Sequence, residues 1–255
     1  MAARRGSKIG IVLVILLMII VGVLFVADRI AVNAAEKQIA QQTRKELVAR
    51  NVTMASDPKV SIAGFPFLTQ VVGGKYKKIT ISVNQPKVNN VQLATLNVVA
   101  ETVHANARAV MNGTGDVVAD KVTGTMTLGW DAVRSIVVLA GLPQEIDPSK
   151  VDISVVDNNV QVKIPLAINT YSVTAIAKGT LVVQAGKVQI HLTSVTTDKG
   201  DLPALVQNII SGYAKQLTAT VNVPALPYAM VINKVQSSND GLLIIATADN
   251  VKLTG

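Results

Sequence analysis

A run of nineteen residues without a charged or strongly polar side chain, Ile9 to Ala27, constrains this chain more than any other feature. As an α-helix it is about 28 Å long at 1.5 Å per residue, which matches the hydrocarbon core of a bilayer. Arg4, Arg5 and Lys8 precede it without any acid, and such an excess of positive charge holds a short N-terminus in the cytoplasm. The sequence therefore predicts a plasma-membrane anchor that is followed by an extracytoplasmic domain.

A cleaved secretory signal is the alternative interpretation of this run. Its basic start is also typical of a signal, and Val32-Asn33-Ala34 has the small residues of a cleavage site. We favour the uncleaved anchor, because the run is longer than the roughly 7 to 15 residues of a signal core and the residues after it continue a helical pattern. A lipoprotein is excluded, because the chain has no cysteine to acylate.

Composition divides the chain into four segments. Residues 28–50 contain no Gly or Pro, which favours helix, and Ser56-Asp57-Pro58 then ends the helical pattern. We predict a basic cytoplasmic N-terminus over 1–8, the transmembrane anchor over 9–27, a helical stalk over 28–50 that packs loosely on the domain, and an extracytoplasmic domain over 51–255.

From Lys59 onward the apolar residues follow the period of a strand. Alternating apolar and polar side chains predict strands near 78–83 and 96–100, a strand near 121–128, and hairpins over 151–164, 181–192 and 230–247. Residues 130–140 and 201–217 have helical spacing instead, with an apolar stripe on each helix. The predicted fold class is α+β, in which a curved, mainly antiparallel sheet wraps around two amphipathic helices and leaves an apolar groove.

The residue types that carry reaction chemistry are scarce. The absence of cysteine excludes disulfides, iron–sulfur clusters and thiolate zinc sites, and neither His104 nor His191 lies in a metal-binding or catalytic pattern. The sequence contains no glycine-rich phosphate loop and no G-x-S-x-G turn. We therefore predict a protein that is not an enzyme, with no cofactor, no metal and no catalytic residue. Nucleic acid is a poor partner, because aromatic residues make up only 3% of a chain that faces away from the cytoplasm.

One motif combines apolar and basic residues. Residues 63–74 read AGFPFLTQVVGG, with two of the three Phe residues around a Pro, and a lysine-rich strand start follows. Aromatic and aliphatic side chains beside basic ones suit an acyl chain and an anionic head group. The alternative is that the two Phe side chains fill one end of the core and the lysines are merely solvated. The predicted contacts with acyl chains, at the mouth and lining of the groove, are Phe65, Pro66, Phe67, Leu68, Ile136, Val137, Leu205, Ile209 and Tyr213, and the predicted head-group contacts are Lys75, Lys77 and Lys78.

The chain resembles the LmeA family of actinobacterial cell-envelope proteins in four stretches: VADRIAVNAAEKQIA, VSIAGFPFLTQVVGGKYKKITISV, ADKVTGTMTLGWDAV and LPYAMVINKVQSSNDGLLIIATADNVKL. The resemblance covers nearly the whole chain and is most specific at Gly64 to Gln70. It implies a fold similar to the tubular lipid-binding folds and an exported protein that binds phospholipid, phosphatidylinositol included. It also implies a role in the elongation of lipomannan beside an envelope glycosyltransferase. A scaffold that stabilises such an enzyme without holding lipid is the alternative.

Overall fold

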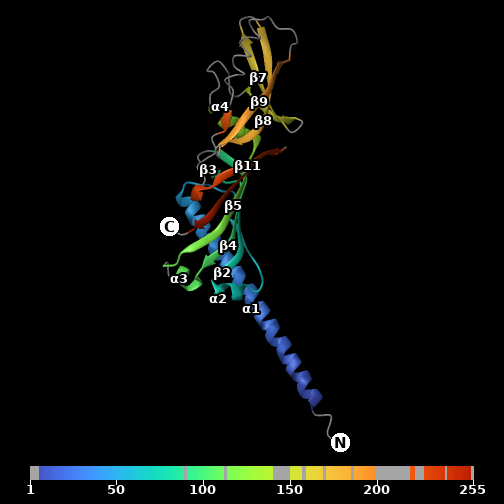
Figure 1. Cartoon of the computed structure of the whole chain (residues 1–255), viewed down its shortest axis with the longest axis vertical. Coiled ribbons are helices and arrows are strands. Elements are labelled where there is room, and N and C mark those ends of the chain that lie inside the picture. The colour runs from blue at the N-terminus through green and yellow to red at the C-terminus, as the bar shows by residue number, and fades with distance from the viewer. Residues whose placement is uncertain are drawn as a thin grey trace.

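The computed structural model describes residues 6–88, 91–111, 114–139, 150–156, 159–168, 171–184, 187–198, 219–221, 227–238 and 240–253. Within them, a 44-residue helix, α1 (Gly6–Ala49), is followed by two antiparallel sheets and several short helices. The molecule is elongated, and the first half of α1 projects from one end of it while the second half runs beside the sheet (Figure 1).

The first sheet has the strand order β1-β2-β4-β5-β12-β11, with β3 paired to β4, and the second has the order β10-β9-β8-β7-β6. Every neighbouring pair is antiparallel. The strands are β1 (Lys59–Ala63), β2 (Lys75–Asn84), β3 (Lys87–Val88), β4 (Val91–Ala105), β5 (Val117–Leu128), β6 (Asp152–Val156), β7 (Asn159–Ile168), β8 (Tyr171–Gln184), β9 (Lys187–Thr197), β10 (Ala219–Val221), β11 (Val231–Ser238) and β12 (Gly241–Lys252). The short helices are α2 (Phe67–Gly73), α3 (Ala107–Met111), α4 (Trp130–Leu139) and the 3₁₀ turn η2 (Pro227–Ala229).

The predicted fold class, α+β with a curved and mainly antiparallel sheet, is confirmed. The three predicted hairpins are β6–β7, β8–β9 and β11–β12, and the helix predicted near Trp130 is α4. The structure differs from the prediction in two ways. The strands divide into two sheets. The short helices α2 and α3 were not predicted, because five to seven residues are too few to show a helical period. The helix predicted over 201–217 lies outside the described residues.

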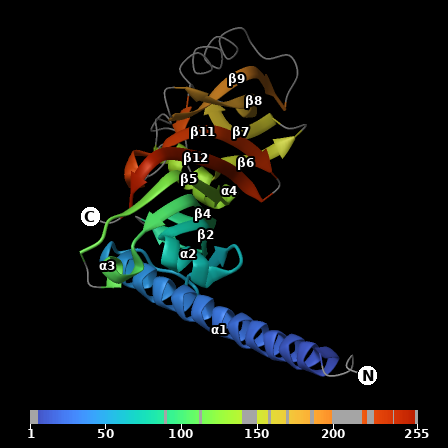
Figure 2. The same cartoon turned by 60° about the horizontal axis from the view of Figure 1, so that its bottom comes forward.

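One core joins the two sheets. Leu128 and Leu242 of the first sheet and Val160 and Val188 of the second are almost fully buried in it, together with Val133 of α4. The indole Nε1 of Trp130 also donates a hydrogen bond to the Ser238 carbonyl at 3.1 Å. These contacts place α4 at the junction of the sheets (Figure 2).

A second core packs α1 against the other end of the first sheet. Val32 of α1 is 5% exposed and lies among Ile62 of β1, Phe67 of α2, and Tyr76 and Val103 of the sheet. The stretch of α1 beyond the apolar run is therefore part of the folded domain.

Strand β4 carries a local reversal that serves this second core. Side chains three residues apart in an unbroken strand point to opposite faces, yet Ala100 and Val103 are both buried in the same core. Thr102 between them has a φ of 50°, which reverses the alternation. Strand β12 has the same feature at Asn250, with a φ of 53°. Residues on both sides of each reversal, Ala100 and Val103 in β4 and Ala248 and Val251 in β12, thus pack in the core that contains Val32 of α1.

We expect Thr102→Gly to leave the free energy of unfolding unchanged or to raise it by up to about 1 kcal/mol, because a β-branched residue is strained at positive φ and glycine is not. Thr80→Gly in the neighbouring strand β2 is the control, and it should lower the free energy of unfolding by about 1 kcal/mol. Chemical denaturation of the full chain in detergent compares the two variants. Equal losses would show that Thr102 is not strained.

Candidate functional site

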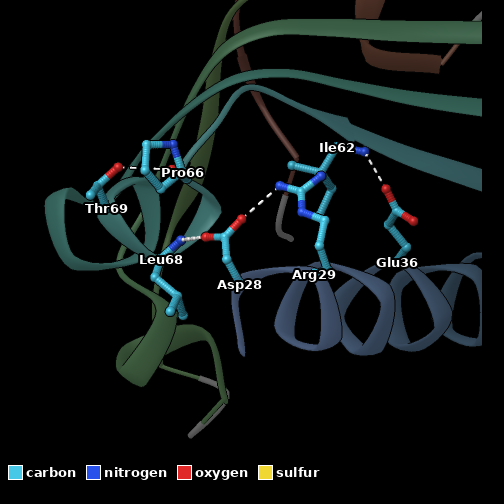
Figure 3. A network of polar contacts seen from close by, with 7 residues as sticks. All are labelled: Asp28, Arg29, Glu36, Ile62, Pro66, Leu68 and Thr69. Carbon is cyan, nitrogen blue, oxygen red and sulfur yellow. Dashed lines mark hydrogen bonds and ion pairs between the residues drawn. The ribbon is translucent and has the colours of Figure 1, made fainter. Parts of the chain in front are cut away.

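The motif between β1 and β2 docks on α1 directly after the apolar run. The Asp28 carboxylate accepts a hydrogen bond from the Leu68 backbone N–H at 2.8 Å, and two turns further along α1 the Glu36 carboxylate accepts one from the Ile62 N–H, also at 2.8 Å. Figure 3 shows the two carboxylates reaching from one helix to Leu68 within the motif and to Ile62 directly before it. We call Asp28, Glu36 and their two backbone donors the clamp.

Asp28 is buried and serves as the cap that α2 lacks. Pro66 occupies the N-cap position and offers no side-chain acceptor, so the first-turn N–H of Leu68 is satisfied by Asp28 from another element. The second carboxylate oxygen accepts a hydrogen bond from Nη2 of Arg29 at 2.6 Å. Desolvation pushes the pKa of the Asp28 carboxyl upward, but the hydrogen bonds and charge of Arg29 and the backbone N–H groups of α2 outweigh it and leave this pKa below its ordinary value.

Arg29 also lies over two aromatic rings. Its guanidinium carbon is 5.9 Å from the ring centroid of Phe25 and 5.4 Å from that of Phe65. The two rings are themselves 5.7 Å apart and tilted against each other. A ring pair of this kind contributes about 0.5–1.5 kcal/mol, and a cation–π contact at an exposed position contributes about 0.5–1 kcal/mol. The end of the apolar run is thereby attached to the motif by side chains as well as by the clamp.

The remaining residues of the motif fix its own shape. Gly64 has a φ of +108°, and a Cβ there would lie 2.8 Å from the Gln70 side chain, so another residue type would strain the turn. The side-chain oxygen of Gln70 accepts a hydrogen bond from the Lys77 N–H at 2.9 Å, and the Thr69 hydroxyl donates one to the Pro66 carbonyl at 2.8 Å. The Phe65–Pro66 peptide bond is cis.

The two Phe side chains of the motif have opposite environments. Phe67 is 5% exposed and packs in the second core, with its ring centroid 6.1 Å from that of Tyr76. Phe65 is 58% exposed, and the same outward side of the segment carries Leu68 at 36% and Val72 at 89%. Pro66 is also exposed. The motif therefore both fills the core and presents an apolar surface.

The structure brings together part of the predicted set. Lys75, Lys77 and Lys78 are exposed at the start of β2, directly after α2, so they lie beside the motif. Ile136 and Val137 belong to α4, which lies apart from α2 in both views (Figures 1 and 2). The predicted lining residues Leu205, Ile209 and Tyr213 lie outside the described residues.

Sequence reasoning missed the residues that α1 contributes. The prediction of a helical stalk over 28–50 gives Asp28, Arg29 and Glu36 no part in the site, and the predicted set does not include Val72. The available signal was that a carboxylate and a guanidinium follow the apolar run immediately. Such charges at the end of a membrane span need partners or water.

Comparison with known proteins adds one match. A family model described as LmeA-like phospholipid-binding matches residues 26–247. This span contains the clamp, the motif and strands of both sheets, and it leaves out most of the apolar run. No curated protein and no solved structure matches the chain.

Replacing Asp28 by Asn should lower the melting temperature at pH 7, because the amide keeps an oxygen for the Leu68 N–H but loses the attraction to Arg29. Since the pKa of Asp28 is lowered in the folded state, its carboxylate stabilises the fold above the unfolded pKa of about 4. This stabilisation is lost as the pH falls through the lower folded value. The difference in melting temperature between the two proteins should therefore close in acid.

Asp57→Asn is the matched control for this comparison. Asp57 also pairs with an arginine of α1, Arg44, at 2.6 Å, but both side chains are exposed. Its loss should be nearly silent at every pH, because exposed ion pairs contribute little. Circular dichroism melts of the full chain in detergent between pH 3 and 7 test both variants. A difference for Asp28→Asn that does not change with pH would contradict the role given to its charge.

Proposed function

The chain belongs to the LmeA-like phospholipid-binding family, and on this premise we propose that it is a membrane-anchored extracytoplasmic protein that binds phospholipid acyl chains in an apolar groove. The family match over residues 26–247 carries this proposal. An anionic phospholipid such as phosphatidylinositol is the proposed ligand, and support of envelope glycolipid synthesis of the lipomannan type is the proposed role.

Two observations on α1 support an anchor that is not cleaved. Among the described residues, α1 is the single helix that is both long enough and apolar enough to cross a membrane. Its apolar side chains from Val14 to Val26 are exposed in the isolated chain. Further along, Asp28 and Val32 are buried against the domain. Cleavage at Val32-Asn33-Ala34 would remove these two side chains from the fold, together with the ring contacts of Phe65.

We propose two separate regions for lipid contact, because α2 and α4 lie apart along the first sheet. The first region is the exposed side of the motif, formed by Phe65, Pro66 and Leu68, with Phe67 as its support in the core. The second is the junction of the sheets at α4, where Ile136 and Val137 would line the groove with the helix predicted over 201–217. Apolar side chains of the second sheet near this junction, including Leu181, Val183 and Val195, are only partly buried, which supports an apolar lining there.

The head group is assigned to Lys75, Lys77 and Lys78. These lysines are exposed on a strand that begins where α2 ends, so they can meet an anionic head group while apolar side chains of the motif meet acyl chains. The competing function is a scaffold that stabilises an envelope glycosyltransferase without holding lipid.

An uncleaved anchor predicts the mature N-terminus. We expect the intact mass of the protein, purified from membranes of the native host or a close relative, to correspond to a start at or near Met1. The protein should also stay with the membrane after a carbonate wash, because the apolar run is embedded. An N-terminus near Ala35 would contradict this topology.

A head-group role for the three lysines predicts a selective loss of anionic lipid. The purified full chain is incubated with equal amounts of phosphatidylinositol and phosphatidylcholine in detergent. We expect the triple substitution Lys75→Gln, Lys77→Gln and Lys78→Gln to lower the ratio of anionic to neutral lipid that stays bound. The expected size is roughly 1 kcal/mol per lysine near a charged surface, and the loss should shrink at high salt. Lipid mass spectrometry after removal of excess lipid measures the ratio.

The control changes the same charge elsewhere. Lys163, Lys187 and Lys234 are exposed on strands away from α2, and their replacement by Gln should leave the ratio unchanged. Phe67→Ser is not suited to this test, because truncating such a buried ring costs about 3–5 kcal/mol of folding free energy. A wild-type protein that repeatedly carries no phospholipid and takes none up would contradict lipid binding and favour the scaffold.

A further inference from the structure

The outward side of α2 exposes two apolar side chains, Leu68 and Val72, beside Thr69, which is unusual for a short surface helix. Its inner residues Phe67 and Val71 pack in the second core, while Leu68 and Val72 are exposed, as is Phe65 two residues before the helix. A helix at a protein–water boundary normally places polar side chains outward. Contiguous exposed apolar side chains mark a contact with a membrane or another molecule.

The position of this face along α1 identifies the contact. Phe65 packs on Phe25, which lies two residues before the end of the apolar run. The hydrogen bond from Leu68 to Asp28 holds the start of α2 at the first residue after that run. If the apolar run fills the hydrocarbon core, α2 is held at the level where hydrocarbon meets head groups.

The charges around this face also fit a bilayer interface. The Arg29 guanidinium lies over the rings of Phe25 and Phe65, and Lys75 and Lys77 begin the next strand. Aromatic and aliphatic side chains bordered by Lys and Arg are the composition found at the head-group level of membranes.

We infer that Phe65, Leu68 and Val72 insert into the interfacial region of the outer leaflet, so that α2 is a second membrane contact beside the anchor. The inference rests on the anchored topology of the proposed function and adds the orientation of the domain to it. The occupant of this face is the bilayer that α1 crosses, because both surfaces are continuous at the Phe25–Phe65 contact. A phospholipid would then reach the motif directly from the leaflet.

The absence of cysteine allows a site-specific test. Val72→Cys places a single thiol on the outward face of α2, and an environment-sensitive dye attached to it reports contact with lipid. Val231→Cys is the matched control, since Val231 is also an exposed valine but begins the opposite edge strand of the same sheet, β11. Both labelled full chains are reconstituted into phosphatidylcholine vesicles containing phosphatidylinositol, with and without lipids that carry a nitroxide at a shallow acyl position.

We expect the dye at position 72 to emit at shorter wavelength than the dye at 231 and to lose emission selectively in the nitroxide vesicles. Equal emission and quenching at the two positions, in protein that resists a carbonate wash, would overturn this inference and leave the anchor intact. Removal of the protein by the wash would overturn the anchor and the inference together. A short-wavelength emission at 72 without nitroxide quenching would show that protein covers this face, and it would overturn the inference as well.

Discussion

The fold depends on one buried carboxylate at the point where the apolar helix meets the domain. Asp28 satisfies the N–H group at the start of α2 and pairs with Arg29, so a charge that would otherwise be costly to bury is fully used. Because Asp28 belongs to α1 and Leu68 to the motif, this interaction fixes the motif relative to the end of the apolar run. The second core and the Glu36 hydrogen bond hold the same arrangement further along α1.

The parts of the fold that were predictable are those specified by local chemistry. Hairpins such as β8–β9 could be located because alternation and turn residues lie within a few positions of each other. The division into two sheets could not, since it follows from which strands pair over long sequence distances. The sequence also could not predict that Ala100 and Val103 share one core, because the positive φ of Thr102 between them breaks the two-residue period of a strand.

The candidate site shows the same limit. The motif and the lysines after it were recognisable from residue type, but the residues that position them were not. Asp28 and Leu68 are 40 positions apart, and no periodicity connects a carboxylate of α1 with a backbone N–H in the first turn of α2. The opposite environments of Phe65 and Phe67 likewise arise from packing on α1 and on the sheet, whereas their neighbourhood in the sequence is shared.

With α1 as the anchor that we propose, the continuity of this helix restricts how far the domain can operate from the membrane. A flexible tether would let the domain sample a large volume, but here the helix runs without interruption from the apolar run to Ala49 and is fastened to the sheet along the way. In this topology the domain is held at a fixed distance from the membrane, and that distance is set by the fold and not by the length of a linker. Any molecule that the domain serves would have to come within this distance of the membrane, and rotation of the helix in the bilayer would turn the whole domain with it.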